Sequence, residues 1–123
     1  MLLILPAQWE RALLRGELRE RGYDALGAPD LEAALVYRPA EPGRGPVRLL
    51  VLDQGVAEAA GALAAVRARH GEPPVLLVAS PSRAAPAGPW TVVLRRPVSV
   101  GETVAAVRRL LPLSAEMSQP LDR

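Results

Sequence analysis

Only a few side chains of this sequence have the chemistry to act in catalysis. The chain has no cysteine, which excludes thiol nucleophiles, disulfide bonds and thiolate metal sites. His70 is the single histidine, so there is no second histidine for a metal pair, and no serine lies in a recognisable nucleophile elbow. His70 precedes Gly71 at the expected end of a helix, where an imidazole interacts well with the helix dipole. We therefore expect His70 to be structural rather than a phospho-carrier or base, and we expect no catalytic residue and no enzyme.

Three polar positions follow apolar runs that have the length of short strands. Asp53 follows one run, Ser80 comes just after the next, and Arg96, with Pro97 behind it, comes just after the last. If these runs are parallel strands of one sheet, their carboxyl ends bring the three side chains to the same edge. We expect Asp53 to cap a loop or to pair with Arg96, whose guanidinium keeps its charge to very high pH. An anion bound between Arg96 and backbone donors is an alternative.

The charge balance argues against several classes of partner. The 123 residues include 15 basic and 13 acidic side chains, a net charge of +2. All the basic residues are arginine, which explains a sequence pI of about 9.9 without a strong positive field. The arginines form no stripe with interleaved aromatic residues, so direct binding of nucleic acid is not expected. The turn Pro6-Ala7-Gln8 is not a glycine-rich phosphate loop, so no nucleotide and no other cofactor is expected.

The same composition bears on location. No stretch approaches the roughly 20 consecutive apolar residues that a membrane span requires, so no membrane contact is expected. The absence of cysteine fits a reducing compartment. We therefore expect a cytoplasmic location.

Apolar runs and helical periodicity alternate along the chain. Ser99 and Glu102 have the spacing of a capping box at the start of a last helix. The segment 80–89 carries three prolines, so no more than one helical turn is expected there. We predict strands at residues 2–5, 23–26, 47–52, 75–78 and 91–94, and helices at 7–21, from Pro29 onward, at 57–70 and from Ser99 onward.

The predicted strands are short and apolar throughout, which is typical of strands buried on both faces. A parallel sheet with helices on each side satisfies this requirement. The sequence therefore predicts a three-layer α/β domain over residues 1–113. Residues 114–123 are polar and aperiodic, and we expect them to form a flexible tail.

Four landmarks give the chain a resemblance to a known family. They are Gly22-Tyr23 before the second strand, the run from Leu49 to Asp53, the run from Pro74 to Val78, and Arg96-Pro97 before the last helix. In this order and spacing, residues 1–112 resemble the receiver domain of bacterial response regulators. The resemblance implies a flavodoxin-like sandwich with strand order 2-1-3-4-5 and a role in two-component signalling.

The sequence departs from the receiver pattern at most of the positions that serve phosphorylation. Asp53 matches the phospho-acceptor, and Ser80, Arg96 and Pro97 stand near the switch positions, although Ala79 is the better match for the switch hydroxyl. The acidic pair that holds Mg²⁺ in the family would fall near Leu5, Pro6 and Ala7, none of which is acidic, and Arg96 replaces the family's lysine. These departures predict a pseudo-receiver with no metal site that acts without phosphorylation. The alternatives are an atypical regulator still phosphorylated at Asp53 and a structural assembly component unrelated to signalling.

The resemblance also suggests where a protein partner, or a second copy of the chain, would bind. In the family the face of the fourth helix, fifth strand and last helix usually carries protein contacts. Core packing is the default expectation for both tryptophans, Trp90 is the better candidate for an interface anchor, and Glu10 is expected on a solvated face. The predicted contact residues on that face are Trp90, Arg95, Val100, Val104, Arg108 and Arg109.

Overall fold

The computed structural model describes residues 1–41 and 43–113, and it contains a five-stranded parallel sheet of order β2-β1-β3-β4-β5. The predicted fold class, a flavodoxin-like α/β sandwich with strand order 2-1-3-4-5, is therefore confirmed. The predicted tail, 114–123, lies outside the described residues. The strands are β1 (Leu2–Ile4), β2 (Leu26–Ala28), β3 (Leu50–Asp53), β4 (Val75–Ala79) and β5 (Trp90–Arg95).

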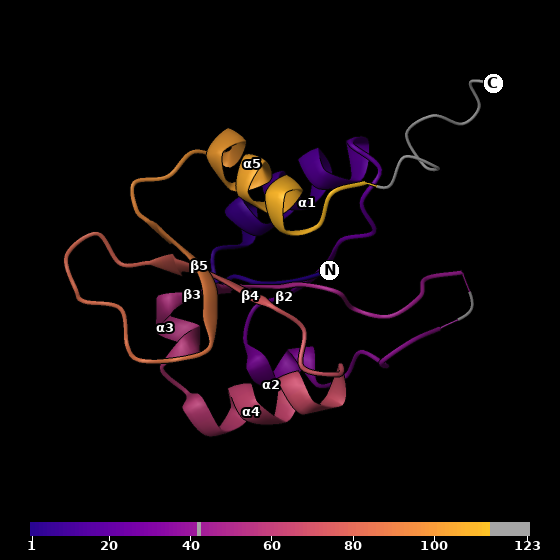
Figure 1. Cartoon of the computed structure of the whole chain (residues 1–123), viewed down its shortest axis with the longest axis horizontal. Coiled ribbons are helices and arrows are strands. Elements are labelled where there is room, and N and C mark those ends of the chain that lie inside the picture. Colours follow the sequence, from indigo (N-terminus) through magenta and orange to yellow (C-terminus); the bar gives the residue numbers. More distant parts are fainter. Residues whose placement is uncertain (42, 114–123) are drawn as a thin grey trace.

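Helices cover both faces of the sheet. Figure 1 shows α1 and α5 on one face and α2, α3 and α4 on the other. Among the described residues no helix is long and apolar enough to cross a membrane. The helices are α1 (Gln8–Glu20), α2 (Leu31–Ala34), α3 (Gln54–Ala57), α4 (Ala60–Arg69) and α5 (Val100–Leu110).

The central strands are apolar at every position because successive side chains enter opposite layers. In β1, Leu2 and Ile4 pack under α2 and α4, whereas Leu3 faces α1 and α5. Leu50 and Val51 of β3 divide in the same way, and all five of these side chains are fully buried. This double burial explains why the strands carry no alternation of polar and apolar residues.

The ends of two helices form as the sequence predicts. Ser99 accepts a hydrogen bond from the backbone N–H of Glu102 (3.0 Å), and the Glu102 carboxylate accepts one from the Ser99 N–H (2.8 Å). This capping box starts α5. Gly22 follows α1 with a φ of +97°, a conformation that favours glycine and ends the helix.

Three predicted elements are wrong in position or continuity. The second strand lies at Leu26–Ala28 rather than 23–26, because Tyr23 turns inward and donates its hydroxyl to the Leu111 carbonyl (2.8 Å). The third strand begins at Leu50 rather than at residue 47. The helix predicted at 57–70 is shorter and forms α4 (Ala60–Arg69), and it is preceded by the unpredicted short helix α3, which Asp53 caps directly after β3.

Candidate functional site

Asp53, Glu10 and Arg96 meet at the carboxyl end of the sheet. Asp53 is the last residue of β3, Glu10 lies in the first turn of α1 just beyond β1, and Arg96 directly follows β5. Both terminal nitrogens of Arg96 donate to the Glu10 carboxylate, Nη1 to Oε2 at 2.8 Å and Nη2 to Oε1 at 3.1 Å. The Nη2 atom also donates to Oδ1 of Asp53 at 3.0 Å. One guanidinium thus bridges two carboxylates.

This cluster is partly shielded from water. The side chains of Arg96, Glu10 and Asp53 are 28%, 25% and 22% exposed. The hydrogen bonds that Arg96 donates to Glu10 raise the pKa of Arg96, burial opposes this, and the hydrogen bond that it donates to Asp53 raises the pKa further. The guanidinium is therefore held in its charged form, and charge-assisted hydrogen bonds of this kind are among the stronger ones in proteins.

The predicted pairing of Asp53 with Arg96 is present in the structure, but the solvated role predicted for Glu10 is wrong. The prediction placed Glu10 on the outer face of the first helix because of its helical period alone. Its distance from the end of the first strand was the available signal, since a residue one helical turn beyond a strand stays at the same edge of the sheet. Asp53 also accepts a hydrogen bond from the Gly55 N–H through Oδ2 (2.9 Å), so both of its oxygens have partners.

Ser80 is committed to its own loop. Its hydroxyl oxygen accepts hydrogen bonds from the backbone N–H groups of Ser82 and Arg83, each at 3.2 Å. Its own N–H donates to Oε1 of the buried Gln54 (2.7 Å). The hydroxyl therefore stabilises the turn after β4, and the structure gives it no hydrogen bond to Asp53 or Arg96.

The connection between β4 and β5 contains no helix, as the prolines predict. Gln54 fastens one end of it, because its Nε2 atom donates to the Ala84 carbonyl (3.0 Å) while Oε1 holds Ser80. Arg95 fastens the same segment by donating to the carbonyls of Ser80 (2.6 Å) and Arg83 (3.0 Å). Pro97 follows through a cis peptide bond with Arg96.

The positions that would carry a metal in receiver domains offer no side-chain oxygen here. Leu5 is buried, and its carbonyl accepts a hydrogen bond from Nη1 of Arg11 (2.6 Å). Pro6 and Ala7 are exposed, but neither has a carboxylate. In the part of the chain that the structure describes, no group of three His, Cys, Asp or Glu side chains is arranged to hold a metal ion.

The predicted contact residues differ in accessibility. Val104 is only 4% exposed and packs in the core, so its assignment to a contact surface is wrong. Val100 is partly buried against the same core, and Trp90 is half-buried with its indole N–H bonded to the Pro86 carbonyl (2.7 Å). Arg95, Arg108 and Arg109 are exposed.

Trp9 does not pack in the core, so the prediction for this residue is wrong. Trp9 is 73% exposed, and Leu13, one turn further along α1, is 45% exposed. The helix instead buries Leu14 and Leu18, so its apolar face is rotated away from Trp9.

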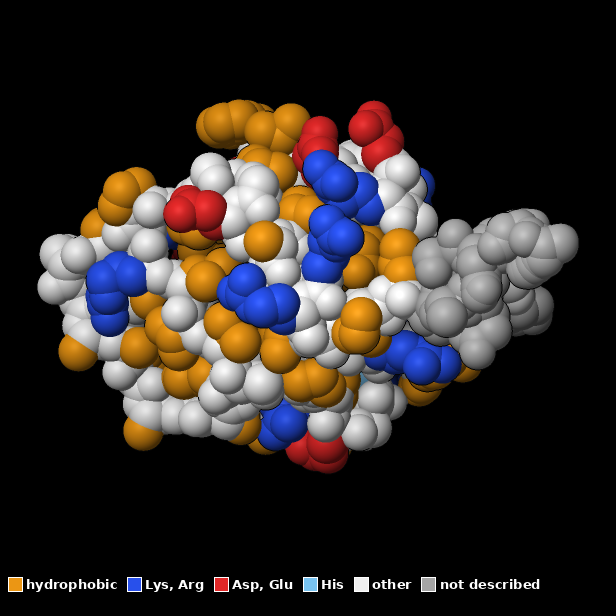
Figure 2. Space-filling model, turned by 45° about the horizontal axis from the view of Figure 1, so that its top comes forward, with side chains coloured by type: hydrophobic (Ala, Val, Ile, Leu, Met, Phe, Trp, Pro, Cys, Tyr) orange, Lys and Arg blue, Asp and Glu red, His pale blue; other side chains and the backbone are white. Residues whose placement is uncertain are grey.

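On the side of the molecule that carries α1 and α5, the arginines lie in small groups separated by uncharged and apolar side chains (Figure 2).

His70 is buried at the end of α4, and neither ring nitrogen has a hydrogen-bond partner among the described residues. Burial lowers its pKa, and the nearby charges of Arg69 and Arg44 lower it further. The imidazole is therefore neutral at pH 7. It lies at the carboxyl end of α4, apart from the cluster of Asp53, Glu10 and Arg96.

Comparison with solved structures identifies the fold. The receiver domain of NtrX from Brucella abortus superposes with a TM-score of 0.68 at 22% identity, covering 92% of this chain and 98% of that domain. The receiver domain of the hybrid histidine kinase CckA gives 0.66 at 26% identity, covering 89% and 96%. A Francisella response regulator receiver domain, 1452, gives 0.67 at 18% identity, covering 89% and 93%. The predicted resemblance to receiver domains is thus confirmed.

This chain also matches part of a longer protein, NtrX. NtrX from Brucella abortus in complex with ADP matches 98% of this chain with a TM-score of 0.70 at 22% identity, but the match spans only 28% of that protein. No protein-family model matches the sequence, and no curated protein is similar to it. The likeness to the solved structures above is a likeness of fold.

Proposed function

We propose that this chain is a receiver-like signalling module of the two-component type that acts by binding a protein partner, without Mg²⁺-dependent phosphorylation of Asp53. The observation that carries the proposal is the Arg96 guanidinium bonded to both Glu10 and Asp53. It occupies one carboxylate oxygen of the aspartate that matches the phospho-acceptor.

Phosphoryl transfer to a carboxylate depends on positive charge placed against the transferring oxygens, and Mg²⁺ commonly supplies part of it. The ion prefers carboxylate and water ligands in near-octahedral geometry. Pro6 and Ala7 provide no such ligand, and both oxygens of Asp53 already accept hydrogen bonds. A metal would have to displace Arg96 from Asp53 and leave Glu10 to hold the guanidinium alone.

The hydroxyl at Ser80 supports the same proposal. Its bonds to the N–H groups of Ser82 and Arg83 would have to break before it followed a phosphoryl group. Gln54 and Arg95 further secure this loop through its backbone. A loop fixed in this way favours a binding role with one conformation over a phosphorylation switch.

An interaction role also accounts for the exposed apolar side chains of α1. Trp9 and Leu13 lie one turn apart on the helix and are 73% and 45% exposed. Large aromatic side chains are frequent anchors of protein interfaces, whereas their exposure to water gains nothing for the folded monomer. We propose that a protein partner covers this pair.

The phosphorylation part of the proposal is tested by titrating Mg²⁺, with and without beryllofluoride, while the amide resonances of Asp53, Ser80 and Arg96 are followed by NMR. We expect no saturable shift in the natural chain. A variant with Pro6→Asp, Ala7→Asp and Arg96→Lys restores the acidic pair and the lysine of the receiver pattern and is expected to respond to both ligands. Arg109→Lys, on the exposed side of α5, is the matched control and should behave like the natural chain.

Saturable shifts of these amides in the natural chain would refute the proposal, because they would show that Asp53 still forms a working site. In that case the chain would be an atypical response regulator phosphorylated at Asp53.

A further inference from the structure

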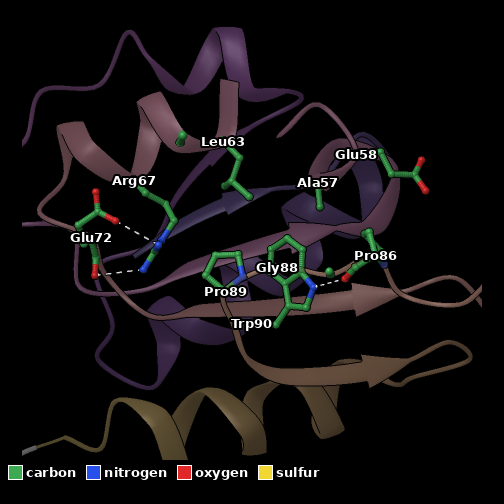
Figure 3. Close-up of a pocket in the computed structure, with 11 residues that line it drawn as sticks. Ala57, Glu58, Leu63, Arg67, Glu72, Pro86, Gly88, Pro89 and Trp90 are labelled. Atoms are coloured by element: carbon green, nitrogen blue, oxygen red, sulfur yellow. Dashed lines mark hydrogen bonds and ion pairs between the residues drawn. The ribbon is translucent and has the colours of Figure 1, made fainter. Parts of the chain in front are cut away.

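A pocket lies where the helix-free connection returns across the sheet to β5. Figure 3 shows Trp90 and Pro89 facing Leu63 and Ala57 across it, so its walls come from the end of α3, from α4 and from the turn before β5. Its volume is about 320 Å³. It is lined by Ala57, Glu58, Leu63, Ala64, Arg67, Glu72 and residues 86–90.

The indole ring of Trp90 forms one wall of the pocket and is held in place by its own turn. Its indole N–H donates to the Pro86 carbonyl at 2.7 Å, which folds the turn over the ring. Gly88 makes this possible, because a Cβ atom at that position would lie 2.3 Å from Cζ2 of Trp90. The indole therefore lies directly against the Gly88 backbone and presents a rigid aromatic surface to the pocket.

The charged groups at the rim already have partners. Glu58 forms an ion pair with Arg83, outside the pocket. Arg67 pairs with Glu72 (3.1 Å) and also donates through Nη2 to the Pro73 carbonyl (3.1 Å). A charged ligand would gain little from these groups unless it broke an existing pair, so the lining selects an uncharged ligand.

The size of the pocket indicates a small molecule rather than a protein surface. An apolar cavity of roughly 150 Å³ is sufficient for benzene, and small-molecule sites begin at roughly 300 Å³. A stable protein interface buries roughly 1,200 Å² or more, which a recess framed by Leu63, Ala64 and Trp90 does not provide. Water in such a recess finds few polar partners, so its displacement by an apolar group is favourable.

We propose that this pocket binds a small, uncharged, mainly apolar molecule with a ring that stacks on Trp90. The site is separate from Asp53 and Arg96, and the proposal does not depend on whether the chain is phosphorylated.

The test uses Trp90 as its own reporter. In a Trp9→Phe chain Trp90 is the only tryptophan. The uncharged fluorescent probe N-phenyl-1-naphthylamine is titrated into this protein. We expect a saturable rise of probe emission on excitation of tryptophan, with a matching fall of Trp90 emission.

Two variants place the probe in the pocket. Ala64→Leu, in the same Trp9→Phe background, fills the recess from the exposed side of α4 and should weaken binding at least roughly tenfold. Ala65→Leu is the matched control, because Ala65 is exposed on the same helix and does not line the pocket; its affinity should be unchanged. Gly88→Ala displaces the indole and should also weaken binding.

The urea midpoint of each variant shows whether it is folded. No saturable energy transfer from Trp90, or equal affinity in Ala64→Leu and Ala65→Leu chains that are both folded, would overturn the proposal.

Discussion

Replacing Arg96 by methionine should destabilise the protein in a way that depends on pH. The Nη2 atom of Arg96 lies 3.1 Å from Oε1 of Glu10 and 3.0 Å from Oδ1 of Asp53, which places these two oxygens within about 6 Å of each other. Without the guanidinium they repel by about 3 kcal/mol at an effective dielectric constant of about 20. Because the side chains keep about a quarter of their exposure, solvent screening reduces this to about 2 kcal/mol.

The loss of hydrogen bonds gives a destabilisation of the same order, because Arg96→Met leaves the partly buried carboxylates of Glu10 and Asp53 without the donors that Arg96 supplied. With a urea dependence of about 2 kcal/mol per molar, the midpoint of unfolding of Arg96→Met should fall by about 1 M at pH 7. This fall in the midpoint would be measured by urea unfolding of three proteins: the natural chain, Arg96→Met and the exposed control Arg109→Met. The control should stay within about 0.5 kcal/mol of the natural chain.

The pH dependence separates this explanation from a loss of packing. Both the repulsion in Arg96→Met and the ion pairs of the natural chain need ionised carboxylates, so both weaken when acid protonates carboxyl groups, whose pKa in model peptides is about 4. The difference between the two proteins should therefore shrink between pH 7 and pH 3.5. An equal difference at both pH values would refute the electrostatic account, and so would a difference below about 0.5 kcal/mol at pH 7.

Two further predictions concern buried polar side chains. The pKa of His70 is lowered below 6.5 by burial, so the unfolded chain takes up a proton first as the pH falls below 6.5, and the folded state loses stability in that range. His70→Leu should remove this loss and be at least as stable at pH 7. Urea unfolding at pH 7 and about 5 measures this, and an equal loss of stability in both proteins would contradict it. Gln54→Leu should lower the free energy of unfolding by about 2 kcal/mol, because it leaves the Ser80 N–H and the Ala84 carbonyl without partners. It should also speed amide hydrogen exchange at Ser80, and an exchange rate equal to that of the exposed control Gln8→Leu would contradict this prediction.

A parallel sheet covered on both faces was predictable because the strands are apolar throughout and separated by helices, whereas the strand order 2-1-3-4-5 came from the resemblance to receiver domains. The exact bounds were not. Tyr23 is an apolar residue in a suitable position for a strand, but its hydroxyl is satisfied by the Leu111 carbonyl, a contact 88 residues away in sequence. The short helix α3 likewise begins directly after β3 because Asp53 caps it, which helical periodicity does not reveal.

The two tryptophans show a similar limit. Trp9, Leu13 and Leu14 fit one helical stripe in the sequence, but only a stripe centred on Leu14 and Leu18 faces the sheet. Trp90 follows three prolines and looked uncovered, yet Gly88 and the Pro86 carbonyl fold the turn onto its ring. In both cases the outcome depends on a rotation or a turn that single-residue hydropathy does not determine.

The substitutions around Asp53 form one consistent arrangement rather than separate losses. A lysine at position 96 would present a single compact ammonium, whereas the planar guanidinium of Arg96 offers two nitrogens to Glu10 and one of them also to Asp53. That fork needs a second carboxylate at the rim of the sheet, and Glu10 supplies it from the first turn of α1. Positions 6 and 7 hold Pro6 and Ala7, so no carboxylate there helps a metal ion to bind beside Asp53 in competition with Arg96. In the function that we propose, these differences act together, because they leave Asp53 paired with the fixed charge of Arg96 instead of carrying a phosphoryl group.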